Sequence, residues 1–427
     1  MSMKKIGITL VSLVLLVSAA WLGASIYVGR TTEKWISTLV EQTTKQKKLR
    51  LVNLKHEQSL FHSQGQFEIR FNELGADAST GKQKFSVVVD YRISNLLLPA
   101  SSMRFNWNMK PSGEYGVEVN RLFGSELALQ GKGQLGYAGK ALTSLKMPEL
   151  VMRDGKDRLN ISPSSGQFSW AGQAVSFDWK TDRISMMTDG MPLDIEGVSA
   201  KADFTNRSRG IGSFEFAVNK LSTKEGTAEG MGVQTTVVER NDRIDLTVNH
   251  KLASLTAAGQ KIRDLVIDLS LSGLDVSSID TLSGIASDSD DFQSLTADEQ
   301  SRAKAAARKL FNQGFTIALP KISAQVNSGS INGDVKVEFL QSDNPAQSEF
   351  SSVKSLRASG QLLAKGKAVD NAQKMMALMM GLATDTKEGL KSSFEFTGTT
   401  FKANGKTRDV SNEISLIDGY INGLLAP

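Results

Sequence analysis

Cysteine is absent from all 427 residues of this chain. The absence excludes disulfides, thiolate nucleophiles and metal sites with cysteine ligands. Histidine is also scarce, since only His56, His62 and His250 occur. The 8 prolines are few beside 37 glycines, which suit the positive φ angles of tight hairpin turns. These scarcities favour a β-rich protein without cysteine chemistry.

Excess charge of one sign is lacking too, because 50 Lys and Arg are offset by 45 Asp and Glu. A net charge of +5 on a chain of this length is too small to indicate nucleic-acid binding. Hydrophobic residues make up 40%, enough for a folded core. The length fits two domains or one elongated sheet, and the composition does not choose between them.

Long hydrophobic runs are missing except at residues 6–29, which follow Lys4 and Lys5 without a charge. A helix of this length crosses a hydrocarbon core of about 30 Å, and Trp21 and Tyr27 suit its far interface. The alternative is a cleaved signal peptide, whose apolar core is normally about 7 to 15 residues. We predict an uncleaved anchor over residues 1–29, in a bacterial inner membrane, with the bulk of the chain in the periplasm.

Residues 30–50 have apolar positions at helical spacing, Trp35, Ile36, Leu39 and Val40. The spacing predicts an amphipathic juxtamembrane helix. Such a helix can lie on the membrane, form a stalk or pack on the sheet.

Residues 51–427 alternate between apolar and polar positions, as in Val87, Val89, Tyr91 and Ile93. A period of two places the apolar side chains on one face of a sheet. Gly, Asn, Asp and Ser fill the gaps between such runs. One of the runs, at residues 115–119, also predicts a strand. We therefore predict a mainly β body with α inserts, a long antiparallel meander forming an elongated, curved sheet.

Two helical insertions interrupt this rhythm. Thr296 and Glu299 have the spacing of a capping box before an alanine-rich helix over about 296–312. A second insert is predicted over about 368–382. Residues 283–291 are expected to form a polar, acidic linker. Asn404 and Gly405 predict a hairpin turn, so the chain is expected to end in sheet.

No catalytic, cofactor or metal site is predicted. His56 and His62 are six residues apart in one expected strand, hence about 20 Å apart. Asp288, Asp290 and Asp291 lack the glycine and final glutamate of a calcium loop. No group of glycines follows a strand and opens a helix, as a phosphate-binding loop requires. No serine has a histidine and an acid placed to suggest a catalytic triad.

A soft apolar cluster in the second insert is the one candidate contact for a lipid or a partner. It consists of Met375, Met376, Met379 and Met380. Core packing against the sheet is the ordinary alternative for such residues.

Four features together resemble the YdgA/YihF-like family of uncharacterised enterobacterial inner-membrane proteins, over nearly the whole chain. They are the Lys-Lys-led span ending in Tyr27, Val28 and Gly29; residues 56–64; the alternating body; and residues 394–405. Gln58 and Ser59 stand where that family often has Arg-Gly. The resemblance implies membrane anchoring and self-association, and it implies no catalytic residues.

Two classes of function remain. The first is a non-enzymatic envelope factor that acts as a scaffold for a homodimer or other envelope proteins, or as a groove that shelters lipid chains. Its layout is similar to that of AsmA-like envelope lipid carriers. The alternative is a periplasmic hydrolase acting on an envelope polymer with a pair from Asp154, Asp157, Asp178 and Asp182. Neighbouring lysines and arginines favour ordinary surface charge for these aspartates. Nucleic acid and cofactors are not expected.

Overall fold

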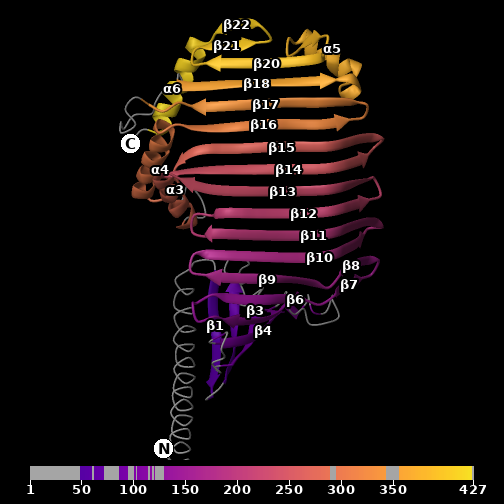
Figure 1. Cartoon of the computed structure of the whole chain (residues 1–427), viewed down its shortest axis with the longest axis vertical. Coiled ribbons are helices and arrows are strands. Elements are labelled where there is room, and N and C mark those ends of the chain that lie inside the picture. The colour runs from indigo at the N-terminus through magenta and orange to yellow at the C-terminus, as the bar shows by residue number, and fades with distance from the viewer. Residues whose placement is uncertain are drawn as a thin grey trace, which may run out of the picture. The chain divides into compact units, whose positions relative to one another are not determined.

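The computed structural model describes residues 49–59, 62–71, 86–94, 101, 103–113, 116–117, 120, 129–288, 295–342 and 355–425. The chain divides into two compact units, Met1–Lys201 and Ala202–Pro427. Antiparallel sheet dominates the described part of each unit, which confirms the mainly β prediction (Figure 1). Strand β11 (Met191–Asn206) carries the boundary between the units.

Unit 1 begins as a meander in which β1 to β6 pair in sequence order. The order then changes, because β6 pairs with β9, and the β7–β8 hairpin pairs instead with the far half of β10. The strands of unit 1 are β1 (Leu49–Gln58), β2 (His62–Phe71), β3 (Ser86–Ser94), β4 (Met103–Ser112), β5 (Leu129–Leu135), β6 (Ala141–Met147), β7 (Leu150–Asp154), β8 (Asp157–Ile161), β9 (Ser164–Ala171) and β10 (Ala174–Thr188).

Unit 2 is a more regular meander of long strands joined by tight turns. Asn241 and Asp242 both have positive φ, as do Asn404 and Gly405, the arrangement of a two-residue hairpin turn. The turn predicted at Asn404 is thereby confirmed. The strands are β12 (Ile211–Thr223), β13 (Gly226–Arg240), β14 (Arg243–Ala257), β15 (Gln260–Asp275), β16 (Phe315–Val326), β17 (Gly329–Phe339), β18 (Leu356–Lys365), β19 (Thr384–Thr386), β20 (Gly389–Thr397), β21 (Thr400–Ala403) and β22 (Lys406–Asp409).

The register of unit 2 places aliphatic and aromatic side chains on one face of the sheet and polar ones on the other. Side chains of paired residues point to the same side, so each apolar run continues into the next strand. We call this surface the apolar face. It comprises Phe214, Phe216, Val233, Thr235, Val237, Leu246, Val248, His250, Ile267, Leu269, Leu271, Phe315, Ile317, Leu319, Ile322, Val335, Val337, Phe339, Ala358, Gly360, Leu362, Ser392, Phe394, Phe396 and Phe401.

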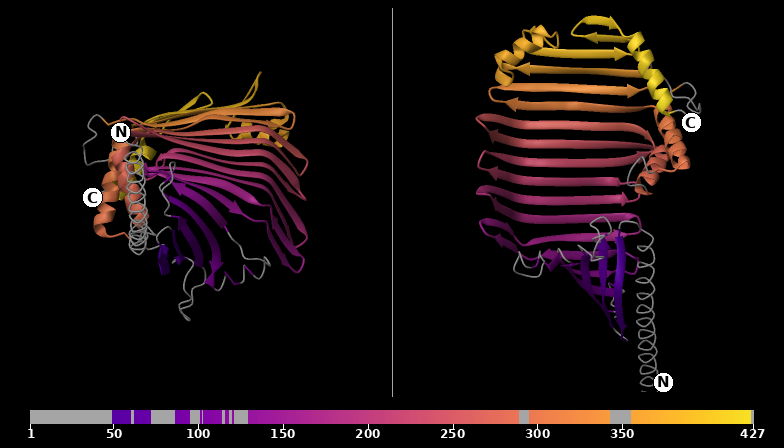
Figure 2. Two further views of the ribbon diagram at one scale, coloured as in Figure 1. Left: turned by 60° about the horizontal axis from the view of Figure 1, so that its bottom comes forward. Right: turned by 180° about the vertical axis from the view of Figure 1, so that it is seen from behind.

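The helices of unit 2 lie at the ends of the strands rather than over the middle of the sheet (Figures 1 and 2). Helices α3, α4 and α6 stand at one end, and α5 stands at the other. The described helices are α3 (Val276–Asp288), α4 (Ala297–Asn312), the short 3-10 turn η3 (Gly366–Ala368), α5 (Asn371–Met379) and α6 (Ser411–Leu425).

Both predicted insertions are confirmed as helices. Thr296 caps α4 with the expected capping box, because its hydroxyl accepts from the Glu299 amide and the Glu299 carboxylate accepts from the Thr296 amide. Asp370 and Gln373 form the same box at α5. Phe311 of α4 packs on Phe315 and Phe339, with ring centroids 5.4 and 5.1 Å away, so α4 covers one end of the apolar face.

Two helices contradict the sequence predictions. Residues up to Asp288 of the expected acidic linker belong to α3, whose first turn is capped by Asp275. Ile285 of α3 is buried with Leu295 and with Ala303 of α4. The contact between the two helices therefore stabilises α3 although its sequence is rich in polar residues. The chain also ends in helix α6 rather than in sheet, with Ile414 buried.

Three predictions concern the first 120 residues. The anchor over residues 1–29 lies outside the described residues, as does the predicted helix except for Leu49 and Arg50. These two residues begin β1 instead of ending a helix, because their backbone pairs with β2. Val117 is helical, so the strand predicted at residues 115–119 is wrong at that residue.

Aromatic rings on the sheet of unit 1 lie against glycines of neighbouring strands. Trp107 pairs with Gly131, and Phe105 pairs with Gly133. A Cβ atom added at Gly131 would lie 2.1 Å from Cε2 of Trp107. Glycine is thus required at a position whose backbone is ordinary strand, because the ring occupies the space of a side chain.

Replacing Gly131 with alanine is expected to lower the free energy of unfolding by about 1–3 kcal/mol, because the added methyl group displaces Trp107. The urea midpoint measures this loss. Gly136→Ala is the control, since its Cβ would meet only the Lys140 carbonyl at 3.6 Å. In a Trp107→Ala background the Gly131→Ala cost should shrink, and an unchanged cost would contradict the steric account.

Asp275 links the start of α3 to the last turn of α4. Burial raises its pKa, but hydrogen bonds from Ser277, Ser278 and Lys309 outweigh burial and lower the pKa from 3.8 to about 2. Lys309 Nζ of α4 lies 3.2 Å from Asp275 Oδ1.

Because the folded pKa of Asp275 is depressed, its stabilisation is present above the unfolded value and is lost as pH falls from about 4 to about 2. Asp275→Asn is expected to reduce stability at neutral pH. It should also reduce the fall in melting temperature between about pH 4 and pH 2, measured in a series of thermal melts. If the melting temperature of Asp275→Asn falls with pH as steeply as that of the parent, other carboxylates control the loss of stability in acid.

Candidate functional site

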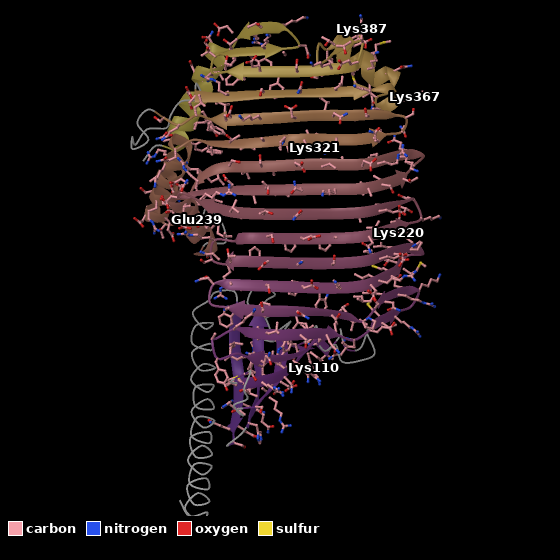
Figure 3. The ribbon with its side chains drawn as sticks, viewed as in Figure 1. Lys110, Lys220, Glu239, Lys321, Lys367 and Lys387 are labelled. Carbon is pink, nitrogen blue, oxygen red and sulfur yellow. The ribbon has the colours of Figure 1, made fainter. Side chains whose placement is uncertain are left out.

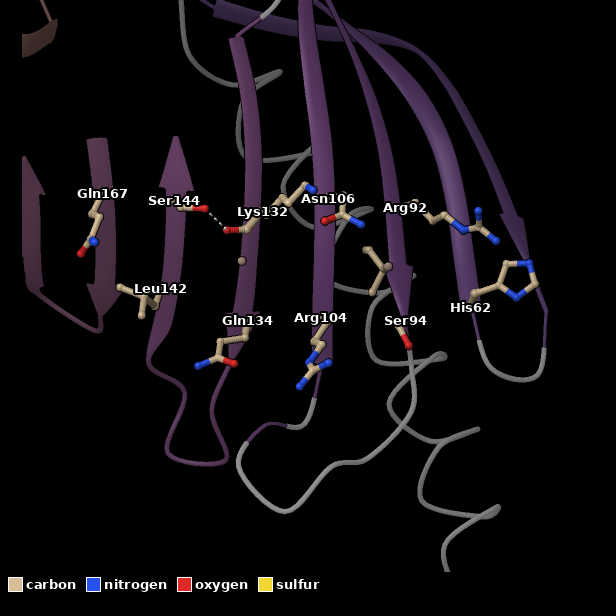
Figure 4. A pocket seen from close by; sticks show the side chains of 12 residues that line it. His62, Arg92, Ser94, Arg104, Asn106, Lys132, Gln134, Leu142, Ser144 and Gln167 are labelled. Atoms are coloured by element: carbon tan, nitrogen blue, oxygen red, sulfur yellow. Dashed lines mark hydrogen bonds between the residues drawn. The ribbon is translucent and has the colours of Figure 1, made fainter. Parts of the chain in front are cut away.

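A groove of about 730 Å³ lies on the polar face of unit 1, across β2 to β6 and β9. It is built by strand register, since Arg92 of β3 pairs with Asn106 of β4, and Asn106 with Lys132 of β5. Arg104 lies two residues from Asn106 on the same strand and is paired with Gln134 of β5. Figure 4 shows these side chains along the groove.

The charge of this basic groove is of one sign. Arg92, Arg104 and Lys132 line it, His62 stands at one end, and no Asp or Glu is among its described lining residues. The remaining polar groups are amides and hydroxyls. Ser144 is one of them, and its hydroxyl donates to the Lys132 carbonyl at 3.1 Å (Figure 4). The arrangement suits a negatively charged ligand and offers no nucleophile paired with a base.

The apolar face of unit 2 is a second candidate surface. Phe214, Phe216, Leu362 and Phe401 are 36–41% exposed, although all four belong to this face. A cluster of buried apolar side chains lies instead where α3 and α4 meet, at Ile285, Leu295 and Ala303. Among the described residues, no layer therefore fully covers these four side chains of the apolar face.

The predicted methionine cluster lies at the surface on α5. Met375, Met376, Met379 and Met380 are 57–82% exposed, and Leu382 beside them is 57% exposed. The core-packing alternative is therefore wrong for these residues in the isolated chain. Lys367 and Lys387 lie near α5 at the same end of the strands (Figure 3).

This methionine cluster borders the apolar face. Ser392, which pairs with Leu362 on that face, donates its hydroxyl to the Leu382 carbonyl at 2.6 Å. Asn404 Nδ2 donates to the Gly381 carbonyl at 2.8 Å. These bonds hold the segment after α5 against β20 and β21.

The histidines occupy separate environments. His56 and His62 were expected in one strand, but they belong to β1 and β2, because the hairpin turns between them. His56 Nδ1 is 2.7 Å from the Tyr91 hydroxyl, and burial raises the pKa of Tyr91 to about 12. No group of three or more His, Cys, Asp or Glu that could hold a metal occurs among the described residues.

The four aspartates of the hydrolase alternative lie in two separate places along the sheet of unit 1. Asp154 and Asp157 flank the tip of the β7–β8 hairpin, where Asp157 Oδ1 accepts from the Asp189 amide at 3.0 Å. Asp178 and Asp182 lie four residues apart on β10, hence about 13 Å apart along the strand. Of the three aspartates near residue 290, Asp288 ends α3 and the other two lie outside the described residues.

The sequence pattern did not predict the basic groove, because the apolar positions of each alternating run define the strands and say nothing of which polar positions lie side by side. Arg92, Arg104 and Lys132 occupy the polar positions of three strands, and they meet only through register. The signal that could have found them is their shared positive charge at alternate positions of three neighbouring strands, between apolar residues for the two arginines and between glycines for Lys132.

No helix among the described residues has both the length and the apolarity needed to cross a membrane. Comparison with curated proteins found no match, and comparison with solved structures found none either. The model of one protein family does match, over residues 3–411. This match confirms the expectation of an uncharacterised bacterial family along nearly the whole sequence. The chain belongs to the family described as a bacterial protein of unknown function (DUF945).

Proposed function

We propose that this protein is a non-enzymatic envelope factor whose apolar face in unit 2 shelters lipid chains. In this proposal residues 1–29 anchor it in the bacterial inner membrane and the body lies in the periplasm. The finer kinship to the YdgA/YihF-like group is part of the same proposal, and it rests on the sequence features alone.

The observation that carries the proposal is the half-exposed state of four large side chains on the apolar face. A sheet with one apolar face must cover that face with another layer. Fully burying a Phe or Leu stabilises by roughly 1.5–3 kcal/mol, so Phe214, Phe216 and Leu362 leave a share of this free energy available to a ligand. Contiguous apolar surface of this kind marks a binding site.

The chemistry of the apolar face favours acyl chains as the occupant. The residues that define it carry His250 as their ionisable side chain, and Thr235 and Ser392 as their hydroxyls. A methylene chain needs no hydrogen-bond partners, whereas a protein surface brings polar groups that this face would leave unpaired. The rows of paired residues run across the strands and offer a path for an extended chain.

The methionine cluster supports the same function at one end of the strands. Methionine is flexible and polarisable, so exposed methionines adapt to ligands of varied shape. Their attachment beside Ser392 and Leu362 connects them to the apolar face. We propose that lipid chains enter or leave the face there.

Lipid retention tests the proposal. Full-length protein extracted gently from bacterial membranes is expected to carry phospholipid or glycolipid in native mass spectrometry. The variant Phe216→Glu/Leu362→Glu should lose most of this lipid, because it places two charges on the apolar face.

The matched control is Ser213→Glu/Ser359→Glu, which adds the same charges to the polar face of the same two strands, β12 and β18. It is expected to retain lipid at the parent level. A lipid-free dimer in the parent protein would contradict the proposal and favour the scaffold function instead.

The methionine cluster makes a second prediction. Because its side chains are exposed, replacing all four methionines with glutamine should change the free energy of unfolding by no more than about 0.5 kcal/mol per site. Lipid retention should fall, whereas a four-leucine variant should keep it. A stability loss of several kcal/mol would contradict a surface role.

A further inference from the structure

We propose that the basic groove of unit 1 is a binding site for a phosphate group, carried by an anionic lipid headgroup or by free phosphate. This inference goes beyond the sheltering of lipid chains in unit 2. It uses different residues on a different unit, so either proposal can fail alone.

The register brings the three cations to one place. Arg92 and Lys132 share a row two strands apart, hence about 10 Å between their Cα atoms, and Arg104 lies diagonally between them at about 8 Å from each. Side chains of this length can converge on one group from such positions. Asn106 lies between Arg92 and Lys132 in the same row and adds an amide donor.

No carboxylate among the described lining residues neutralises this charge. Asp90 lies two residues before Arg92 on β3, and it accepts a hydrogen bond from Gln66 Nε2 at 2.7 Å. Several exposed cations elsewhere in the described chain are matched with acids at short range. Examples are Arg183 with Asp194 at 2.7 Å, Arg209 with Glu239 at 2.9 Å and Lys336 with Glu338 at 2.6 Å.

The donor set matches phosphate rather than a neutral ligand. Guanidinium groups donate in a planar fork that fits phosphate oxygens, and a lysine adds a point charge. Three cations held within about 10 Å repel one another, and an anion between them relieves that repulsion. A groove of about 730 Å³ has room for a complete glycerophosphate headgroup.

Titration calorimetry of the full-length protein in a nonionic detergent tests the site. The probes are inorganic phosphate, short-chain dihexanoyl phosphatidylglycerol and dihexanoyl phosphatidylcholine. The variant Arg92→Gln/Arg104→Gln/Lys132→Gln is expected to bind phosphate and phosphatidylglycerol at least tenfold more weakly than the parent. The variant Arg92→Lys/Arg104→Lys, which keeps the charges, should retain most of the parent's affinity. Added salt should weaken binding in the parent protein.

The charge-matched control is Arg153→Gln/Arg158→Gln/Lys180→Gln, which removes three exposed cations of the same unit outside the groove. It should bind like the parent. Preference for phosphatidylglycerol over phosphate assigns the site to a headgroup, and the reverse preference assigns it to free phosphate. Equal binding by the groove variant and the parent, an equal loss in the control, or no binding of either anionic probe would overturn the proposal. Lipid retained on the apolar face would be unaffected by that failure.

Discussion

The apolar face of unit 2 needs a cover, and the rest of that unit is arranged around this constraint. Hydrogen bonding between strands fixes the register, and the register gathers side chains such as Val248 and Leu319 on one side of the sheet. The described helices stand at the strand ends, where Phe311 of α4 packs on Phe315 and Phe339. Phe216 on β12 and Leu362 on β18 remain half-exposed on this face. An external apolar ligand is the cover we propose.

The same construction gives unit 1 a different surface. Its apolar rows are filled by rings that lie over glycines, as Trp107 does over Gly131, so large side chains pack within the layer of the sheet itself. The polar side then gathers Arg92, Arg104 and Lys132 in one groove. In our account the two units contribute complementary surfaces, apolar for chains and basic for phosphate, and each arises from period-two alternation combined with strand register.

Local sequence signals predicted much of this fold. Alternation predicted the strands, and the capping box at Thr296 and the turn at Asn404 were confirmed in detail. Long-range pairing could not be predicted, because alternation states which face a residue takes and not which strand lies beside it. Hence His56 and His62 were wrongly placed in one strand, and α3 was missed because its stability depends on contact with α4. The groove was missed for the same reason, whereas the methionine cluster was visible as a short apolar run.

The most direct test of the central claim places a photo-crosslinking amino acid at Val248 on the apolar face, and in a parallel variant at neighbouring Thr247 on the polar face. Both full-length proteins are irradiated in bacterial membranes, and the adducts are identified by mass. The account predicts a lipid adduct at position 248 and little or none at position 247. Peptide adducts alone at position 248, or equal lipid adducts at both positions, would contradict it.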